Sequence, residues 1–151
     1  IIQYTKDGGQ NWTKMTVDKL PGTPSSAFVN DIKADLHDTE TAYVLLDNHK
    51  FGDYKPYVFK TTNGGKKWTS ITNGLPDGTL VWRIVQDHVN PNLLFLGTEY
   101  GVYISLNQGA PQSSPLRLAP LVIRDQINAQ CKLFCRFQCE TKAKARFLSY
   151  C

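Results

Sequence analysis

The stretch Tyr4–Trp12, YTKDGGQNW, recurs almost unchanged further along the chain as Lys60–Trp68, KTTNGGKKW. Both copies carry a Thr, an Asp or Asn, a Gly and a Trp at the same offsets, and equivalent residues lie 56 positions apart. A third, weaker copy, SLNQGAPQ, begins at Ser105, 44 positions after the second, and has Gln112 in place of the Trp. Periods of this size predict a repeat protein with one supersecondary unit per period.

Each copy has the residues of a tight β-hairpin. An Asp or Asn at a turn accepts hydrogen bonds from the backbone N–H groups ahead of it, and paired glycines supply the positive φ that such a turn demands. We expect Trp12 and Trp68 to occupy equivalent buried positions, since a large ring can pack between neighbouring units. The residues expected to serve the fold are Thr5, Asp7, Gly9, Trp12, Thr61, Asn63, Gly65, Trp68, Ser105, Asn107 and Gly109.

Apolar β-rich runs separated by turn residues predict units of four antiparallel strands. Residues 28–72 give one complete unit, with the strands FVNDIKA, AYVLLD, PYVFKT and WTSIT. Residues 81–118 give a second unit, which ends in the weaker hairpin. Residues 1–17 fit the end of an earlier unit, and 120–127 fit the start of a further one.

The pattern S/T-x-D/N-x-G-x-x-W resembles the Asp-box, or BNR repeat, of sialidases, sortilin-type domains and xyloglucanase-type glycoside hydrolases. The runs Asn30–Trp68 and Val81–Ser105 together look like bacterial sortilin-like, glycosyl hydrolase-like BNR-repeat proteins. The resemblance covers residues 1–127 and implies a partial β-propeller of four-stranded antiparallel blades. It also implies a larger exported parent, extracellular or periplasmic, whose remaining blades are partners of this chain. In those families the Asp-box is a structural hairpin on the face away from the binding site.

Composition narrows the function classes. Hydrophobic residues make up 41% and charged residues 20% of the 151 residues, as in ordinary globular proteins. No apolar run reaches the roughly 20 residues of a membrane span, and we expect no signal peptide within these residues. Because the chain starts inside a motif, we expect it to be a fragment. Residues 1–110 contain ten Lys or Arg and eleven Asp or Glu, so this part of the sequence does not indicate nucleic-acid binding.

Residues 128–151 form a divergent, basic, Cys-rich tail, which carries all four cysteines: Cys131, Cys135, Cys139 and Cys151. A metal site, disulfides, free thiols and a sequence out of frame with the parent gene all remain open. The basic residues Lys142, Lys144 and Arg146 are expected to be solvated.

Strand order places the loops between second and third strands at the end opposite the hairpins. The candidate ligand-binding residues at that end are Asp47, His49, Asp53, Trp82, Arg83, Glu99 and Tyr100. The aromatic rings suit stacking on sugars. The Asp and His residues of the first loop lack a recognised metal spacing, so we expect no metal and no cofactor.

Three functions remain open. The first is a non-catalytic module that binds a protein, peptide or glycan, and the second is a purely structural part of a larger protein. The third is a glycoside hydrolase, which needs paired carboxylates. The possible members of such a pair are Asp31, Asp47, Asp53 and Glu99. No pair stands out, so the catalytic residues are unknown and the binding module is favoured.

Overall fold

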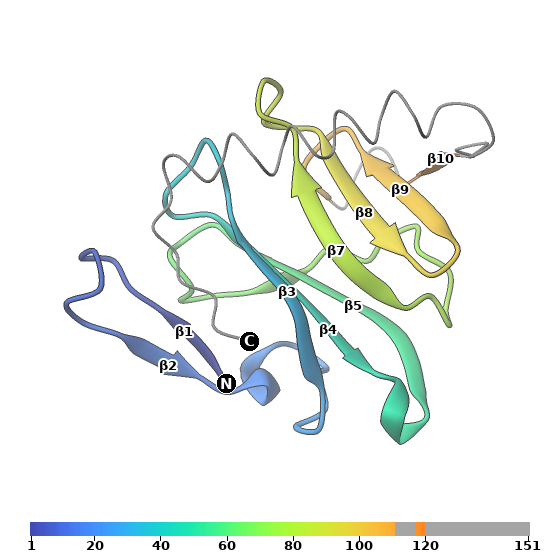
Figure 1. The fold of residues 1–151 in the computed structure, drawn as a ribbon, viewed down its shortest axis with the longest axis horizontal. Coiled ribbons are helices and arrows are strands. Elements are labelled where there is room, and N and C mark those ends of the chain that lie inside the picture. Colours follow the sequence, from blue (N-terminus) through green and yellow to red (C-terminus); the bar gives the residue numbers. More distant parts are fainter. Residues whose placement is uncertain (111–116, 120–151) are drawn as a thin grey trace, which may run out of the picture. The chain divides into compact units, whose positions relative to one another are not determined.

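The computed structural model describes residues 1–110 and 117–119. This part of the chain contains β-strands and two short 3-10 turns, and no α-helix (Figure 1). The expected all-β class is confirmed. None of the described segments is a helix long and apolar enough to cross a membrane. The expected strand at 120–127 and the Cys-rich tail at 128–151 lie outside the described residues.

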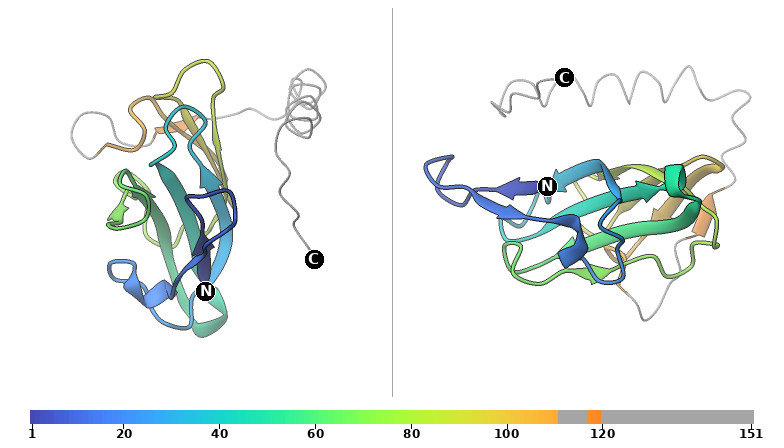
Figure 2. Two further views of the ribbon diagram at one scale, coloured as in Figure 1. Left: turned by 90° about the vertical axis from the view of Figure 1, so that its left-hand side faces the viewer. Right: turned by 90° about the horizontal axis from the view of Figure 1, so that it is seen from below.

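In the described part of the chain, ten strands form three antiparallel sheets (Figures 1 and 2). The N-terminal sheet is a two-stranded hairpin of β1 (Ile2–Tyr4) and β2 (Thr13–Met15). The first four-stranded sheet contains, in spatial order, β3 (Phe28–Ala34), β4 (Ala42–Asn48), β5 (Asp53–Thr61) and β6 (Thr69–Ser70). The second contains, in spatial order, β7 (Val81–Gln86), β8 (Leu94–Thr98), β9 (Gly101–Ser105) and β10 (Arg117–Ala119).

Two 3-10 turns complete the described structure. Turn η1 (Val17–Lys19) follows β2, and turn η2 (His49–Phe51) joins β4 to β5. The sequence predicts the strands AYVLLD and PYVFKT here, but β4 continues to Asn48 and β5 already starts at Asp53. Gly52 closes η2 with a φ of 75°, in the left-handed region that glycine tolerates. The connection is therefore tighter than its polar sequence suggests.

The two four-stranded sheets have the same orientation, which the contacts between β3 and β7 establish. The Asn30 amide donates to the carbonyl of Val81 at 2.8 Å. One residue further, Asp31 accepts from the Ile84 N–H at 3.1 Å. Beyond the end of β3, the Leu36 N–H donates to the side chain of Gln86 at 2.7 Å. These contacts advance in the same direction along both strands, so β3 and β7 run parallel.

The core has two layers, one on each face of the first four-stranded sheet. Between the two four-stranded sheets lie Tyr43, Leu45, Val58, Ile71, Val81, Ile84, Leu94, Leu96 and Tyr103. On the other face, the N-terminal segment covers the sheet with Ile2, Val17, Leu20 and Ala27 against Val44, Leu46, Tyr57, Phe59 and Trp68. Strand β4 is therefore covered on both faces, which explains why its sequence is apolar almost throughout rather than alternating.

The two tryptophans of the repeated hairpins differ in burial, which corrects the expectation that both are buried. Trp68 is 7% exposed and packs in the second core layer, as expected. Trp12 is 53% exposed. Trp68 is covered because the preceding segment, with Ile2 and Val17, packs on its sheet. No described segment covers the β1–β2 hairpin in this way, so the Trp12 indole bonds its own turn, donating to the carbonyl of Gly9 at 3.0 Å.

The three turns share one hydrogen-bond pattern. In the second copy, Thr61 accepts from the N–H of Gly65 at 3.1 Å and donates to Asn63 at 3.0 Å, while Asn63 accepts from the N–H of Lys67 at 2.9 Å. The first copy makes the same bonds through Thr5, Asp7, Gly9 and Asn11. The third repeats the first two bonds through Ser105, Asn107 and Gly109.

The sequence explains why the third turn lacks one of these hydrogen bonds. Its residue equivalent to Lys67 is Pro111, which has no backbone N–H to donate. Asn107 donates instead to the carbonyl of Ala110 at 3.2 Å. Gln108 stands where the other copies have their first glycine, and it adopts a φ of 55°. The backbone conformation is thus kept although its glycine is lost, at a cost in local strain.

Candidate functional site

The candidate ligand-binding residues lie at one end of both four-stranded sheets. Asp47 pairs with Phe28 at the start of β3, and Thr98 pairs with Val81 at the start of β7. Because β3 and β7 run parallel, η2 and the Glu99–Tyr100 loop lie at the same end. Thr61, which begins the second hairpin turn, pairs with Ala42 at the opposite end. The two loops therefore lie at the end of the sheets opposite the second hairpin turn.

His49 is held by a buried carboxylate. Asp47 is 4% exposed and lies where the register of β4 and β5 shifts. Its carboxylate accepts a hydrogen bond from the His49 backbone N–H at 2.9 Å. The same carboxylate lies 2.5 Å from Nδ1 of the His49 imidazole. Together these two contacts hold the imidazole so that its Nε2 points away from Asp47.

The His49 ring links the two sheets at this end. Its centroid lies 6.2 Å from that of Trp82, with the rings edge to face at 69°. Trp82 is the second residue of β7 and is 41% exposed, so the pair presents an open aromatic surface. The register of β7 shifts between Val81 and Arg83. This bulge leaves the successive side chains of Trp82 and Arg83 both exposed, where a regular strand would turn one inward.

A second aromatic pair extends the surface, and sequence reasoning missed it. The rings of Phe28 and Phe51 stack with centroids 6.3 Å apart and planes inclined by 17°. They are 47% and 63% exposed. The Lys50 ammonium lies 5.1 Å from the centre of the Phe28 ring. We call His49, Phe28, Phe51 and Trp82 the aromatic end.

Asp53 accepts hydrogen bonds from residues of its own strand. It accepts from the Tyr57 hydroxyl at 2.6 Å and from the Lys55 N–H at 3.3 Å. The Tyr57 hydroxyl bond holds the pKa of Asp53 below its usual value. Burial, together with the neighbouring carboxylate, raises the pKa of Tyr57 to about 12. Asp53 therefore stays ionised and bonded within β5, and does not point to acid–base chemistry.

The other candidate carboxylates also have structural partners. Glu99 accepts from the backbone N–H of Leu80 at 3.2 Å, which ties its loop to the start of β7. Asp31 accepts from Ile84 and joins β3 to β7. Tyr100 next to Glu99 is 70% exposed and free of the core. Within residues 1–110 and 117–119, no three His, Cys, Asp or Glu side chains are grouped to hold a metal.

Chemically, this arrangement offers rings and fixed polar groups rather than a paired acid and base. Each of the four carboxylates considered for glycoside hydrolysis already accepts a hydrogen bond that shapes the fold. The aromatic end provides flat apolar surface with an imidazole and an ammonium beside it. Compared with known proteins, the sequence matches no family model and no curated protein.

Proposed function

We propose that this chain is part of a β-propeller, in which each four-stranded sheet is one blade. Three features support the proposal: repeated hairpin turns, two sheets with the same strand order, and parallel first strands β3 and β7. In a propeller the first strands of all blades run parallel along the central axis. About 4–8 blades are needed for closure, so the proposal includes further blades of a larger, exported, sortilin-like BNR-repeat protein.

The function that the site supports best is non-catalytic binding of a glycan, peptide or protein at the aromatic end. The contact between His49 and Trp82 carries this proposal, because it joins loops of neighbouring sheets into one exposed surface. Arg83, Glu99 and Tyr100 extend the surface along the second sheet. Aromatic and arginine side chains are the residue types that most often dominate binding energy at such surfaces.

A paired experiment separates binding from hydrolysis. The chain is applied to an array of plant, bacterial and animal glycans and to a peptide array, and the bound glycans are then assayed for released reducing ends. We expect retention of at least one array class and no release of reducing ends above a buffer control. Release of reducing ends, abolished by substituting a carboxylate beside the aromatic end, as in Asp47→Asn, would favour the glycoside hydrolase instead.

A further inference from the structure

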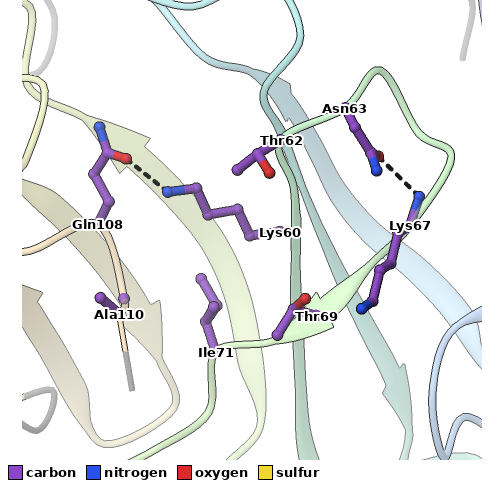
Figure 3. A pocket seen from close by; sticks show the side chains of 9 residues that line it. Lys60, Thr62, Asn63, Lys67, Thr69, Ile71, Gln108 and Ala110 are labelled. Atoms are coloured by element: carbon purple, nitrogen blue, oxygen red, sulfur yellow. Dashed lines mark hydrogen bonds between the residues drawn. The ribbon is translucent and has the colours of Figure 1, made fainter. Parts of the chain in front are cut away.

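A hollow of about 230 Å³ lies between the second and third hairpin turns, at the end of the sheets opposite the aromatic end. Figure 3 shows the side chains that line it. Its polar lining comes from Lys60, Thr62, Asn63, Lys67, Thr69 and Gln108. Two of these residues are cations, and none of the described lining residues is a carboxylate. The hollow therefore has the charge and the hydrogen-bond donors that suit an anion.

Lys60 is the central group of the hollow. Its ammonium donates to the side-chain oxygen of Gln108 at 2.6 Å (Figure 3). The same ammonium lies 5.8 Å from the centre of the Tyr43 ring. Burial lowers the pKa of Lys60, while the charges of Asp35 and Asp38 oppose this shift. An ammonium has three donors, so the bond to Gln108 leaves donors available for a bound group.

The equivalent space between the first and second turns has a different lining. Tyr4 occupies the position of Lys60 there, 56 residues earlier. Its ring lies against Gly65, where an added Cβ would come within 3.0 Å of two ring carbons. At the equivalent Gly109 the nearest side chain is Ile71, 2.9 Å from an added Cβ, and the Lys60 ammonium reaches Gln108 instead.

The two spaces also differ in charge. Beside the first, Lys6 forms an ion pair with Glu40 at 2.9 Å, and Asp7 adds a further carboxylate. The corresponding residues beside the second are all neutral: Thr62 for Lys6, Asn92 for Glu40 and Asn63 for Asp7. Glu40 and Asn92 correspond in the structure rather than in the repeat alignment. The backbone carbonyl of Glu40 accepts from the Gly64 N–H, and that of Asn92 accepts from the N–H of Gln108, the residue equivalent to Gly64.

Lys67 adds a second cation to the hollow. Its equivalent in the first space is Asn11, which is neutral and donates to Asp7 at 2.6 Å. The first space is thus bordered by one ammonium and two carboxylates, whereas the described lining of the hollow has two ammonium groups and no carboxylate.

We propose that this hollow binds a small tetrahedral oxyanion, either free or as the sulfate group of a sugar. Lys60 and Lys67 supply the positive charge, and the hydroxyls of Thr62 and Thr69 supply neutral donors. Lysine binds such groups as a point charge. The site is separate from the aromatic end and does not depend on the function proposed for it.

The test is an NMR titration of the ¹⁵N-labelled chain at pH 7, with ionic strength held constant by sodium chloride. The probes are inorganic phosphate, inorganic sulfate and galactose 6-sulfate. We expect saturable shifts of the Thr62, Asn63 and Gly109 amides. Lys60→Met, which keeps the length of the side chain, should weaken binding at least tenfold, and Lys67→Gln severalfold. Tighter binding of galactose 6-sulfate than of free sulfate would identify a sugar as the source of the group, and equal affinities would identify the free ion.

The matched control is Lys66→Gln, because Lys66 is exposed in the same turn but does not line the hollow. Its affinity for all three probes should equal that of the unmodified chain. Shifts that rise linearly without saturation overturn the proposal, as does equal weakening by Lys66→Gln. If Lys60→Met does not fold, Lys67→Gln decides, and unchanged affinity in that variant overturns the site.

Discussion

The hydroxyl of Thr61 accepts a hydrogen bond from the backbone N–H of Gly65 at 3.1 Å, and this bond closes the second hairpin turn. The same bond joins Thr5 to Gly9 at 2.9 Å and Ser105 to Gly109 at 2.8 Å. One turn geometry is therefore built three times with different residues. The natural variation among the copies supplies control substitutions for testing what each residue contributes.

Asn63→Ala should lower the free energy of unfolding by roughly 0.5–1.5 kcal/mol, the usual contribution of a hydrogen bond. The substitution removes the acceptor for both the Lys67 N–H and the Thr61 hydroxyl. Urea denaturation measures the change. Asn63→Asp is the control and should change stability by less than about 0.5 kcal/mol, because Asp7 makes the same bonds in the first turn. An equal loss of stability in both variants would show that the missing hydrogen-bond acceptor is not the cause of the destabilisation.

Asp7 should titrate far below an ordinary aspartate. Hydrogen bonds from the backbone and side chain of Asn11, and from Thr5, lower its pKa from 3.8 to about 2. Since the folded pKa is depressed, the ionised carboxylate stabilises the turn above pH 3.8, and this contribution disappears as the pH falls through about 2. The NMR shift of the side-chain carboxyl carbon follows the titration. A midpoint near 3.8 would mean that these bonds do not form in solution.

Trp68→Ala should destabilise the chain by about 3–5 kcal/mol, as expected for truncating a large buried side chain. Its ring packs with Ile2 and Val17 and links the N-terminal segment to the first four-stranded sheet. Trp12→Ala should cost less than about 1 kcal/mol, because that ring is 53% exposed. Chemical denaturation of the two variants side by side measures the difference. Equal losses would contradict the unequal burial of the two tryptophans.

The strands were largely predictable because they depend on local sequence. Turn residues separate the apolar runs, and the run AYVLLD gave the start of β4 at Ala42. The burial of the two tryptophans was not predictable from the repeat. It depends on which segment covers each hairpin, because the two hairpins share the same motif residues but have different tertiary neighbours. The extension of β4 through Asn48 likewise depends on pairing with Asp53.

The candidate site was predictable only in part. Antiparallel strand order was enough to place His49 and Trp82 at one end. The stacked pair of Phe28 and Phe51 was missed, because single aromatic residues 23 positions apart carry no local signal of contact. A phenylalanine at the first position of an inner strand, opposite an aromatic residue in a tight loop, is the signal that was available. The charge difference around Lys60 appears only when the repeats are aligned in space.

Ligand binding at the aromatic end and the adjoining Tyr100 is tested most directly by the affinity of Trp82→Ala/Tyr100→Ala for the array ligand that binds the unmodified chain most tightly. We expect at least a tenfold loss without unfolding, since both rings are exposed. Trp12→Ala, which removes an exposed ring outside the aromatic end, should bind normally. Unchanged affinity in the double variant, or no array ligand for the unmodified chain, would contradict the proposed binding.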